Sequence, residues 1–296
     1  MSFYHFQEDM GIFLKNTIYK LIDNKRDSLL QDISLTWINY PNNEMHTKGF
    51  GCGFNNYMNI YPASIVKLVY GLAVYKWIEE DKLIFDNCIE EAVYKMLHDS
   101  SNDATSFVLD VLTGTCSGLS IEGETWANWK YQRQIINDWL KSLNWIELKD
   151  FNCCQKTWED SPYGREKDFY GKNNENTNLM STKGTGRIFE EIMKNTTYNK
   201  ENVNLKNYLS RGLNKASYKL NPNNQIEGLL GEGLPDCLPY WSKAGLMSKV
   251  RHDAAWWTNN DSSHTLLIVF GNSAEFVQDK SIFPLIAKTI YEYKQI

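Results

Sequence analysis

The chain has 296 residues, of which 42% are hydrophobic and 23% charged, and this length can bury a substantial core in one large domain or two intertwined lobes. Its 31 basic and 36 acidic residues give a net charge of −5 without a basic stripe, which argues against nucleic-acid binding. No window approaches the uncharged apolar length that a membrane span needs. We therefore expect neither nucleic acid nor a membrane as a partner.

The first segment, MSFYHFQEDMGIFLKNTIYKLI, lacks the basic stretch, apolar run and small-residue cleavage site of a signal peptide. This favours a cytoplasmic protein. The cysteines show no CxxC spacing of the kind that binds metals, so we expect reduced thiols and no metal; they are Cys52, Cys88, Cys116, Cys153, Cys154 and Cys237. The sequence leaves open the redox state of the adjacent pair, Cys153 and Cys154.

The elements that follow are predicted in chain order from their hydrophobic periods. An amphipathic helix over 6–23 precedes a hairpin of two strands, 32–40 and 46–55. The next part is mostly helical, and its predicted helices cover 64–79, 88–97, 103–113, 125–144, 182–194 and 202–212. One long irregular run interrupts them at 152–178, a length that is usually functional or mobile. The remaining elements are three strands and a helix, at 240–248, 252–259, 263–271 and 276–294.

This order predicts an α/β (α+β) protein with one five-stranded antiparallel sheet built from both ends of the chain and flanked by the terminal helices. Residues 1–62 and 215–296 are expected to form the sheet lobe. Residues 63–214 are expected to form an all-helical lobe that includes the omega-like loop 152–178. We expect one structural unit, with a groove where the lobes meet.

Ser64 and Lys67 stand three residues apart at the start of an apolar helix, just after Pro62. Residues at this spacing are neighbours on a helix, so the lysine amine could take the proton of the serine hydroxyl. That role requires the lysine pKa to fall from about 10.4 towards neutrality, which burial and nearby cations can achieve. The alternative is a helix-capping serine followed by a lysine that reaches to solvent.

Two further motifs are weak by themselves. Ser100, Ser101 and Asn102 precede an apolar helix, where they could relay a proton and hold a carbonyl, or merely cap the helix. Lys243-Ala244-Gly245 lies in a predicted strand, where the glycine would let a ligand approach the backbone. Lys243 could equally be a protective edge-strand lysine.

The order of these motifs is more informative than any one of them. Ser64-x-x-Lys67, Ser100-x-Asn102 and Lys243-Ala244-Gly245 follow the Ser-x-x-Lys, Ser-Asp-Asn and Lys-Thr-Gly set of class A β-lactamases and penicillin-binding proteins. The chain resembles these serine hydrolases through most of its length. The Arg251-His252-Asp253 turn and the segment NLMSTKGTGRIFEEI also resemble parts of that family.

The resemblance implies an acyl-enzyme mechanism on Ser64, with no metal or cofactor. Lys67 would be the base or proton relay, and Ser100 would pass a proton to the leaving group. Asn102 would hold the substrate amide, while Lys243 would supply positive potential beside Gly245. The backbone N–H groups of Ser64 and Leu246 would form the oxyanion hole. The implied partner is a small-molecule or peptide-like acyl substrate.

Two departures from the family pattern limit that implication. Ala244 lacks the hydroxyl that helps to bind a substrate carboxylate, although Arg251 or Ser248 could compensate. The family's deacylating glutamate motif is also missing. Glu166 is the candidate for activating water in its place, with a surface ion pair to Arg165 or Lys167 as the alternative.

The sequence thus favours an intracellular serine acyl hydrolase that acts on an amide, a lactam or an ester. β-Lactam catabolism is one form of that chemistry. Two other interpretations stay open: a glutaminase-like amidase, because glutaminases share the Ser-x-x-Lys arrangement on a related fold, and a non-catalytic or weakly active binding protein on the same scaffold.

Overall fold

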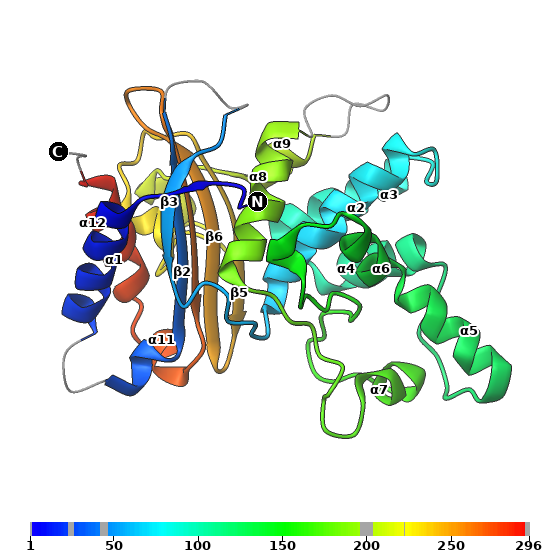
Figure 1. Ribbon diagram of the computed structural model, residues 1–296. Coiled ribbons are helices and arrows are strands. Elements are labelled where there is room, and N and C mark those ends of the chain that lie inside the picture. Colours follow the sequence, from blue (N-terminus) through cyan, green and yellow to red (C-terminus); the bar gives the residue numbers. More distant parts are fainter. Residues whose placement is uncertain (1, 23–26, 42–46, 196–203, 222, 294–296) are drawn as a thin grey trace.

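A seven-stranded sheet forms the centre of the computed structural model, which describes residues 2–22, 27–41, 47–195, 204–221 and 223–293 (Figure 1). The strands lie in the order β1-β3-β2-β7-β6-β5-β4. Their bounds are β1 His5–Phe6, β2 Ile33–Tyr40, β3 Phe50–Phe54, β4 Ser210–Arg211, β5 Tyr240–Met247, β6 Val250–Thr258 and β7 His264–Gly271.

The five longer strands pair antiparallel, as predicted, and join the two ends of the chain through β2 and β7. Residues 42–46, which contain most of the predicted hairpin turn, lie outside the described residues. The prediction of five strands missed β1 and β4, which have two residues each and extend the two edges of the sheet. A strand of that length shows no alternating pattern in a sequence.

Most of the predicted helical ranges contain a helix, and some of them contain two helices where one was expected. They are α1 Glu8–Leu21, α2 Lys67–Glu79, α3 Asn87–Tyr94, α4 Asn102–Thr113, α5 Gly123–Arg133, α6 Ile135–Ser142, α7 Gly164–Tyr170, α8 Thr182–Asn195, α9 Leu205–Leu209, α10 Lys215–Tyr218, α11 Ala274–Gln278 and α12 Ile282–Tyr291. The predicted helix 125–144 is α5 and α6, and the predicted helix 276–294 is α11 and α12. The prediction of a helix over 202–212 was wrong at its end, because α9 stops at Leu209 and strand β4 follows; residues 202 and 203 lie outside the described residues. The expected irregular run 152–178 contains α7.

Five short helical turns complete the described structure. They are η1 Asp27–Leu30, η2 Ala63–Val66, η4 Ile146–Leu148 and η5 Leu230–Gly233, which are 3-10 turns, and the π-helical turn η3 Lys95–Asp99. None of the helices in the described ranges is long and apolar enough to cross a membrane.

The sheet is covered on both faces (Figure 1). Helices α1 and α12 lie on one face, whereas α8 lies against the other face, with the remaining large helices beyond it. Successive residues of β6 enter opposite cores: Trp256 packs towards α8, and Trp257 packs towards α1 and α12. This alternation follows from the pleat of a strand, and burying each such side chain stabilises the fold by about 1.5–3 kcal/mol.

Helix α2 is deeply buried on the α8 side of the sheet. Its residues from Lys67 to Tyr75 are all buried, so it has no polar face. It begins at Lys67, directly after η2, which carries Ser64. The fold thus places Ser64 and Lys67 where a central helix meets the sheet, and η2 packs against β5.

Candidate active site

Three segments that are far apart in the sequence line one cavity of about 450 Å³ with Ser64. They carry Ser100 and Asn102, the residues 157–159, and the end of β5 with the residue that follows it. The lining residues are Tyr61, Ala63, Ser64, Ser100, Asn102, Thr157, Trp158, Glu159, Leu246, Met247 and Ser248. Residues of the first two predicted motifs therefore meet at one place, and β5, the strand that carries the third motif, ends there.

The backbone around Ser64 is sharply turned. Pro62 accepts a 3.1 Å hydrogen bond from the N–H of Ile65, which closes the turn η2. Ala63 has a φ of 46°, a left-handed conformation that costs a residue with a side chain about 1–2 kcal/mol. This turn leaves Ser64 partly exposed to the cavity while Ala63 and Ile65 are buried.

The Lys67 amine contacts two residues that line the cavity, Ser100 and Asn102, and its side chain is fully buried. It donates to the carbonyl oxygen of Ser100 at 2.6 Å, to Asn102 Oδ1 at 2.7 Å and to Ser100 Oγ at 3.2 Å. Burial lowers the pKa of Lys67 from 10.5 to about 7, although Glu159 raises it in part. A substantial fraction of this amine is therefore neutral near pH 7 and able to accept a proton.

The expected hydrogen bond between Lys67 and Ser64 is not among those that the described residues form. Within the described residues, no hydrogen bond joins Lys67 Nζ to Ser64 Oγ, and the amine instead has three acceptors on Ser100 and Asn102. An ammonium group has three N–H donors, so these acceptors satisfy the charged form completely. The neutral form needs only two of them, and its lone pair can then turn towards a hydroxyl.

Ser100 stands between the two lysines of the motifs. It ends the turn η3 with a left-handed φ of 61°, and its hydroxyl oxygen lies 3.2 Å from Lys67 Nζ and 2.9 Å from Lys243 Nζ. The capping alternative is correct for its neighbour, because Ser101 Oγ accepts from the N–H of Ala104 at the start of α4. The adjacent serines thus differ in their contacts: Ser101 caps α4, and Ser100 lies within hydrogen-bonding distance of both lysines.

Asn102 connects Lys67 to the omega-like segment. Its Oδ1 accepts from Lys67 at 2.7 Å and from Thr157 Oγ1 at 2.8 Å, and its Nδ2 donates to Glu159 Oε1 at 2.8 Å. Neither Thr157 nor Glu159 belongs to a motif that the sequence predicts for the site. Their positions depend on the path of the loop, which no local spacing in the sequence predicts. The one signal for Glu159 is that it is an acidic residue of this loop.

Strand β5 forms the opposite wall, and Gly245 allows it to come close to η2. A Cβ added at Gly245 would lie 2.7 Å from the carbonyl oxygen of Pro62 and 3.0 Å from a side-chain carbon of Ile65. Lys243 is fully buried, and burial together with Lys67 and Arg211 lowers its pKa well below the usual value. Leu246 reaches the cavity lining two residues after the buried Ala244.

Arg251 does not face the cavity, in contrast to the expectation that it could bind a substrate carboxylate. Its guanidinium donates to three backbone carbonyl oxygens, those of Phe276 at 2.7 Å, Gly228 at 2.8 Å and Val277 at 2.7 Å. These bonds hold α11 against β6. Ser248, the other candidate for that role, does line the cavity.

Glu166 also lies away from the cavity. It is fully buried in α7, where Arg133 donates to it at 2.7 Å and Ser117 at 2.8 Å. Its partner is therefore neither Arg165 nor Lys167, the two that the sequence suggested. The same cluster joins Lys156 to Asp110 at 2.6 Å. These bonds fix both ends of the segment that presents Thr157 and Glu159.

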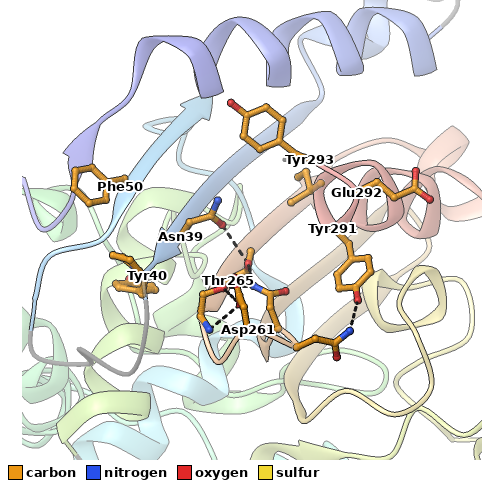
Figure 2. A pocket seen from close by; sticks show the side chains of 13 residues that line it. Asn39, Tyr40, Phe50, Asp261, Thr265, Tyr291, Glu292 and Tyr293 are labelled. Carbon is orange, nitrogen blue, oxygen red and sulfur yellow. Dashed lines mark hydrogen bonds between the residues drawn. The ribbon is translucent and has the colours of Figure 1, made fainter. Parts of the chain in front are cut away.

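A second cavity, of about 760 Å³, lies at the other end of the sheet strands (Figure 2). Asn39, Thr265, Tyr291 and Tyr293 are among its lining residues, and Asn39 Oδ1 is engaged by Thr265 Oγ1 at 3.1 Å. No serine–lysine pair lines this cavity in the described part of the chain.

The structure adds two observations on metals and thiols. Across the described ranges, no group of three or more His, Cys, Asp or Glu side chains is placed to hold a metal ion. All six cysteines are free thiols. Burial raises the pKa of Cys154 to about 12 and that of Cys153 well above its ordinary value, which favours the thiol over the thiolate at both positions.

Comparison with solved structures identifies the fold. The TLA-1 extended-spectrum beta-lactamase superposes with a TM-score of 0.66 at 14% identity, covering 96% of this chain and 99% of that chain. A beta lactamase from Xanthomonas campestris pv. campestris gives a TM-score of 0.64 at 11% identity, covering 96% and 98%. PBP-A gives 0.60 at 12% identity, covering 98% and 97%. The fold is that of the β-lactamases and related transpeptidases.

The sequence itself also matches a family model. The model of the beta-lactamase enzyme family covers residues 86–294, which contain Ser100, Asn102 and Lys243 and begin after Lys67. No curated protein sequence matches the chain. The family model spans more than half of the chain, and the fold and the motif order agree with it. The protein belongs to the beta-lactamase enzyme family.

Proposed function

We propose that this protein is a serine acyl hydrolase that forms an acyl-enzyme on Ser64 with an amide, lactam or ester substrate. The observation that carries the proposal is the position of the Lys67 amine. It is buried beside a cavity that Ser64, Ser100 and Asn102 line, its pKa is lowered to about 7, and its hydrogen bonds lead to Ser100 and Asn102.

In the acylation step, Ser64 Oγ attacks the substrate carbonyl carbon. The hydroxyl proton passes to neutral Lys67, whose N–H donors stay on the two nearer acceptors, Ser100 O and Asn102 Oδ1. The oxyanion that forms is stabilised by the N–H groups of Ser64 and Leu246. Collapse breaks the bond to the leaving group, which takes up a proton through the Ser100 hydroxyl. The acyl group is then an ester of Ser64.

In the hydrolysis step, water adds to that ester and Ser64 is released with the acid product. A general base must take the water proton. Glu159 is better placed for this role than Glu166, because it lines the cavity and its carboxylate accepts from Asn102. Glu166 is engaged instead by Arg133 and Ser117. We therefore assign water activation to Glu159.

Hydrolysis of a chromogenic ester, followed in the parent and in Ser64→Ala, tests the proposal. The expected result is a burst equal to the enzyme concentration in the parent, followed by a slower steady rate, with no burst in the variant. A burst of equal size in both proteins would contradict the proposal, as would equal steady turnover. A fluorescent penicillin and a general serine-hydrolase probe give parallel labelling assays.

One observation favours a second candidate, a non-catalytic binding protein on the same scaffold. The Lys67 donors are occupied by Ser100 and Asn102, and Ser64 Oγ has no hydrogen bond to Lys67 among the described residues. This candidate predicts that ester or lactam ligands bind reversibly, without a mass increase on Ser64. Retention of ligand by both the parent and Ser64→Ala, with no covalent adduct on either, would establish it.

A further inference from the structure

Gln225 fills a position beside the two motif residues Lys243 and Ala244. Its side chain is 9% exposed, and its Oε1 accepts from Lys243 Nζ at 3.0 Å and from the N–H of Ala244 at 3.0 Å. Its Nε2 donates to the carbonyl oxygen of His98 at 2.8 Å. Both partners of the oxygen are donors and the partner of the nitrogen is an acceptor, so these bonds fix the orientation of the carboxamide.

The Lys243 amine has no N–H donor left for a substrate, because each one already has an acceptor within the described structure. Its amine has three acceptors: Ser100 Oγ at 2.9 Å, Gln225 Oε1 at 3.0 Å and the carbonyl oxygen of Ala244 at 2.9 Å. An ammonium group has three N–H donors, and a neutral amine has two. In either protonation state, a substrate anion could bind Lys243 only by displacing one of these acceptors.

The Ala244 N–H points to the edge of β5 that faces away from β6. Within the described sheet, β4 pairs with β5 only at Tyr240 and Trp241, so the later part of β5 has a free edge. Backbone groups alternate along a strand, and the N–H of Leu246 therefore points to the same side as that of Ala244. Gln225 thus occupies the hydrogen-bonding position next to the proposed oxyanion hole.

The two neighbouring arginines, Arg211 and Arg251, are not placed to bind a substrate anion in place of Lys243. The described lining of the cavity includes neither Arg211 nor Arg251. Arg211 donates to the carbonyl oxygen of Leu97 at 2.8 Å, and Arg251 is bound to backbone carbonyls beyond the sheet. The charged residue in the lining is Glu159, which disfavours an anion.

We propose that Gln225 determines specificity by taking the acceptor position on Lys243 and Ala244, so that the site selects neutral acyl substrates over carboxylate-bearing ones. The inference rests on the proposed acylation of Ser64. A carboxylate would have to displace the Gln225 amide and leave the His98 carbonyl unpaired. A neutral ester or amide has no such requirement. Exposed apolar side chains at the cavity, Leu246 (49% exposed) and Met247 (47% exposed), suit an apolar substituent on that substrate.

Benzylpenicillin and its methyl ester provide a matched pair of probes, because they share the lactam and differ only in the carboxylate. The measurement is the second-order rate constant for adduct formation on Ser64, followed by intact mass. For the parent, we expect the methyl ester to react at least about tenfold faster than the acid, the factor that one displaced buried hydrogen bond corresponds to.

Variants of Gln225 test the cause of this preference. Gln225→Ala frees Lys243 and the Ala244 N–H, so the preference should fall to about threefold or less, or reverse. Gln225→Met gives the same expectation while conserving volume, in case the alanine variant fails to fold. Gln225→Glu should reject the acid at least as strongly as the parent. Gln278→Ala, an exposed glutamine change on α11, is the matched control and should keep the parental preference.

The outcomes separate this inference from the proposed function. Equal or faster reaction of the acid with the parent would overturn the role of Gln225 while supporting acylation of Ser64. An unchanged preference in both Gln225→Ala and Gln225→Met would also overturn it. Failure of both probes and of a general serine-hydrolase probe to modify Ser64 would overturn the proposed function, and the inference with it.

Discussion

The hydroxyl oxygen of Ser100 lies 2.9 Å from the amine nitrogen of Lys243. The same oxygen is 3.2 Å from Lys67 Nζ, so one hydroxyl connects the two buried amines. A hydroxyl can accept from one amine and donate to another group, which allows it to pass a proton between Lys67 and a leaving group. The arrangement explains how a proton taken from Ser64 could reach the departing nitrogen or oxygen.

Replacing Ser100 with alanine removes this connection. Ser100→Ala should slow acylation of Ser64 by about 10²-fold or more, the usual contribution of a positioned proton-transfer group. Ser101→Ala is the control, because Ser101 caps α4 and should cost about 1 kcal/mol of unfolding free energy without an equal loss of rate. Stopped-flow acylation and urea unfolding measure the two effects. Equal rate losses in both variants would argue against the relay.

The acylation rate should depend on the protonation of Lys67. Only the neutral amine accepts a proton, and the lowered pKa of Lys67 is about 7, so the rate should rise with pH and level off above a midpoint near 7. Lys67→Arg keeps the positive charge and cannot be neutral at these pH values, so it should abolish the rise. Measuring the rate from pH 5 to 9 tests this. A pH-independent rate in the parent would contradict it.

The two glutamates of the omega-like segment should respond differently to substitution. Glu159→Gln removes the carboxylate at the cavity and should lengthen the lifetime of a Ser64 adduct by about 10²-fold or more. Glu166→Gln removes one of the two charged partners of the buried Arg133, with Asp110 remaining, and should lower the unfolding free energy by up to about 3 kcal/mol. Time-resolved intact mass and chemical denaturation measure these effects. A longer adduct lifetime in Glu166→Gln alone would reverse the assignment.

A methyl group at Gly245 should disturb the site. Gly245→Ala would place a Cβ 2.7 Å from the Pro62 carbonyl oxygen, so β5 and the turn η2 would have to separate. We expect a loss of about 1–3 kcal/mol in unfolding free energy and slower acylation of Ser64. Gly212→Ala is the control, since its Cβ would meet no atom within 4 Å. Similar behaviour of the two variants in thermal unfolding would contradict this account of the packing.

Hydrophobic periodicity was sufficient to predict the five long strands and most of the helices. It failed where elements are short or broken: β1 and β4 have two residues each, and the predicted helix 125–144 divides between α5 and α6. Periodicity describes which face of an element is buried, whereas these breaks depend on tertiary contacts.

The candidate site shows the same division. The order of the motifs was enough to predict that Ser64, Ser100 and Asn102 line one cavity. The roles suggested for Arg251 and Glu166 were not supported, because both side chains satisfy buried partners elsewhere. Glu159 and Gln225 hold positions at the site that depend on loop paths, and no spacing in the sequence relates them to Lys67 or Lys243.

Covalent modification of Ser64 tests the central claim most directly. The protein is incubated with benzylpenicillin methyl ester, and the modified residue is located by peptide mass mapping in the parent and in Ser64→Ala. The account predicts a single acyl adduct on the peptide that contains Ser64 in the parent, and none in the variant. An adduct on another residue, or the same adduct in Ser64→Ala, would contradict it.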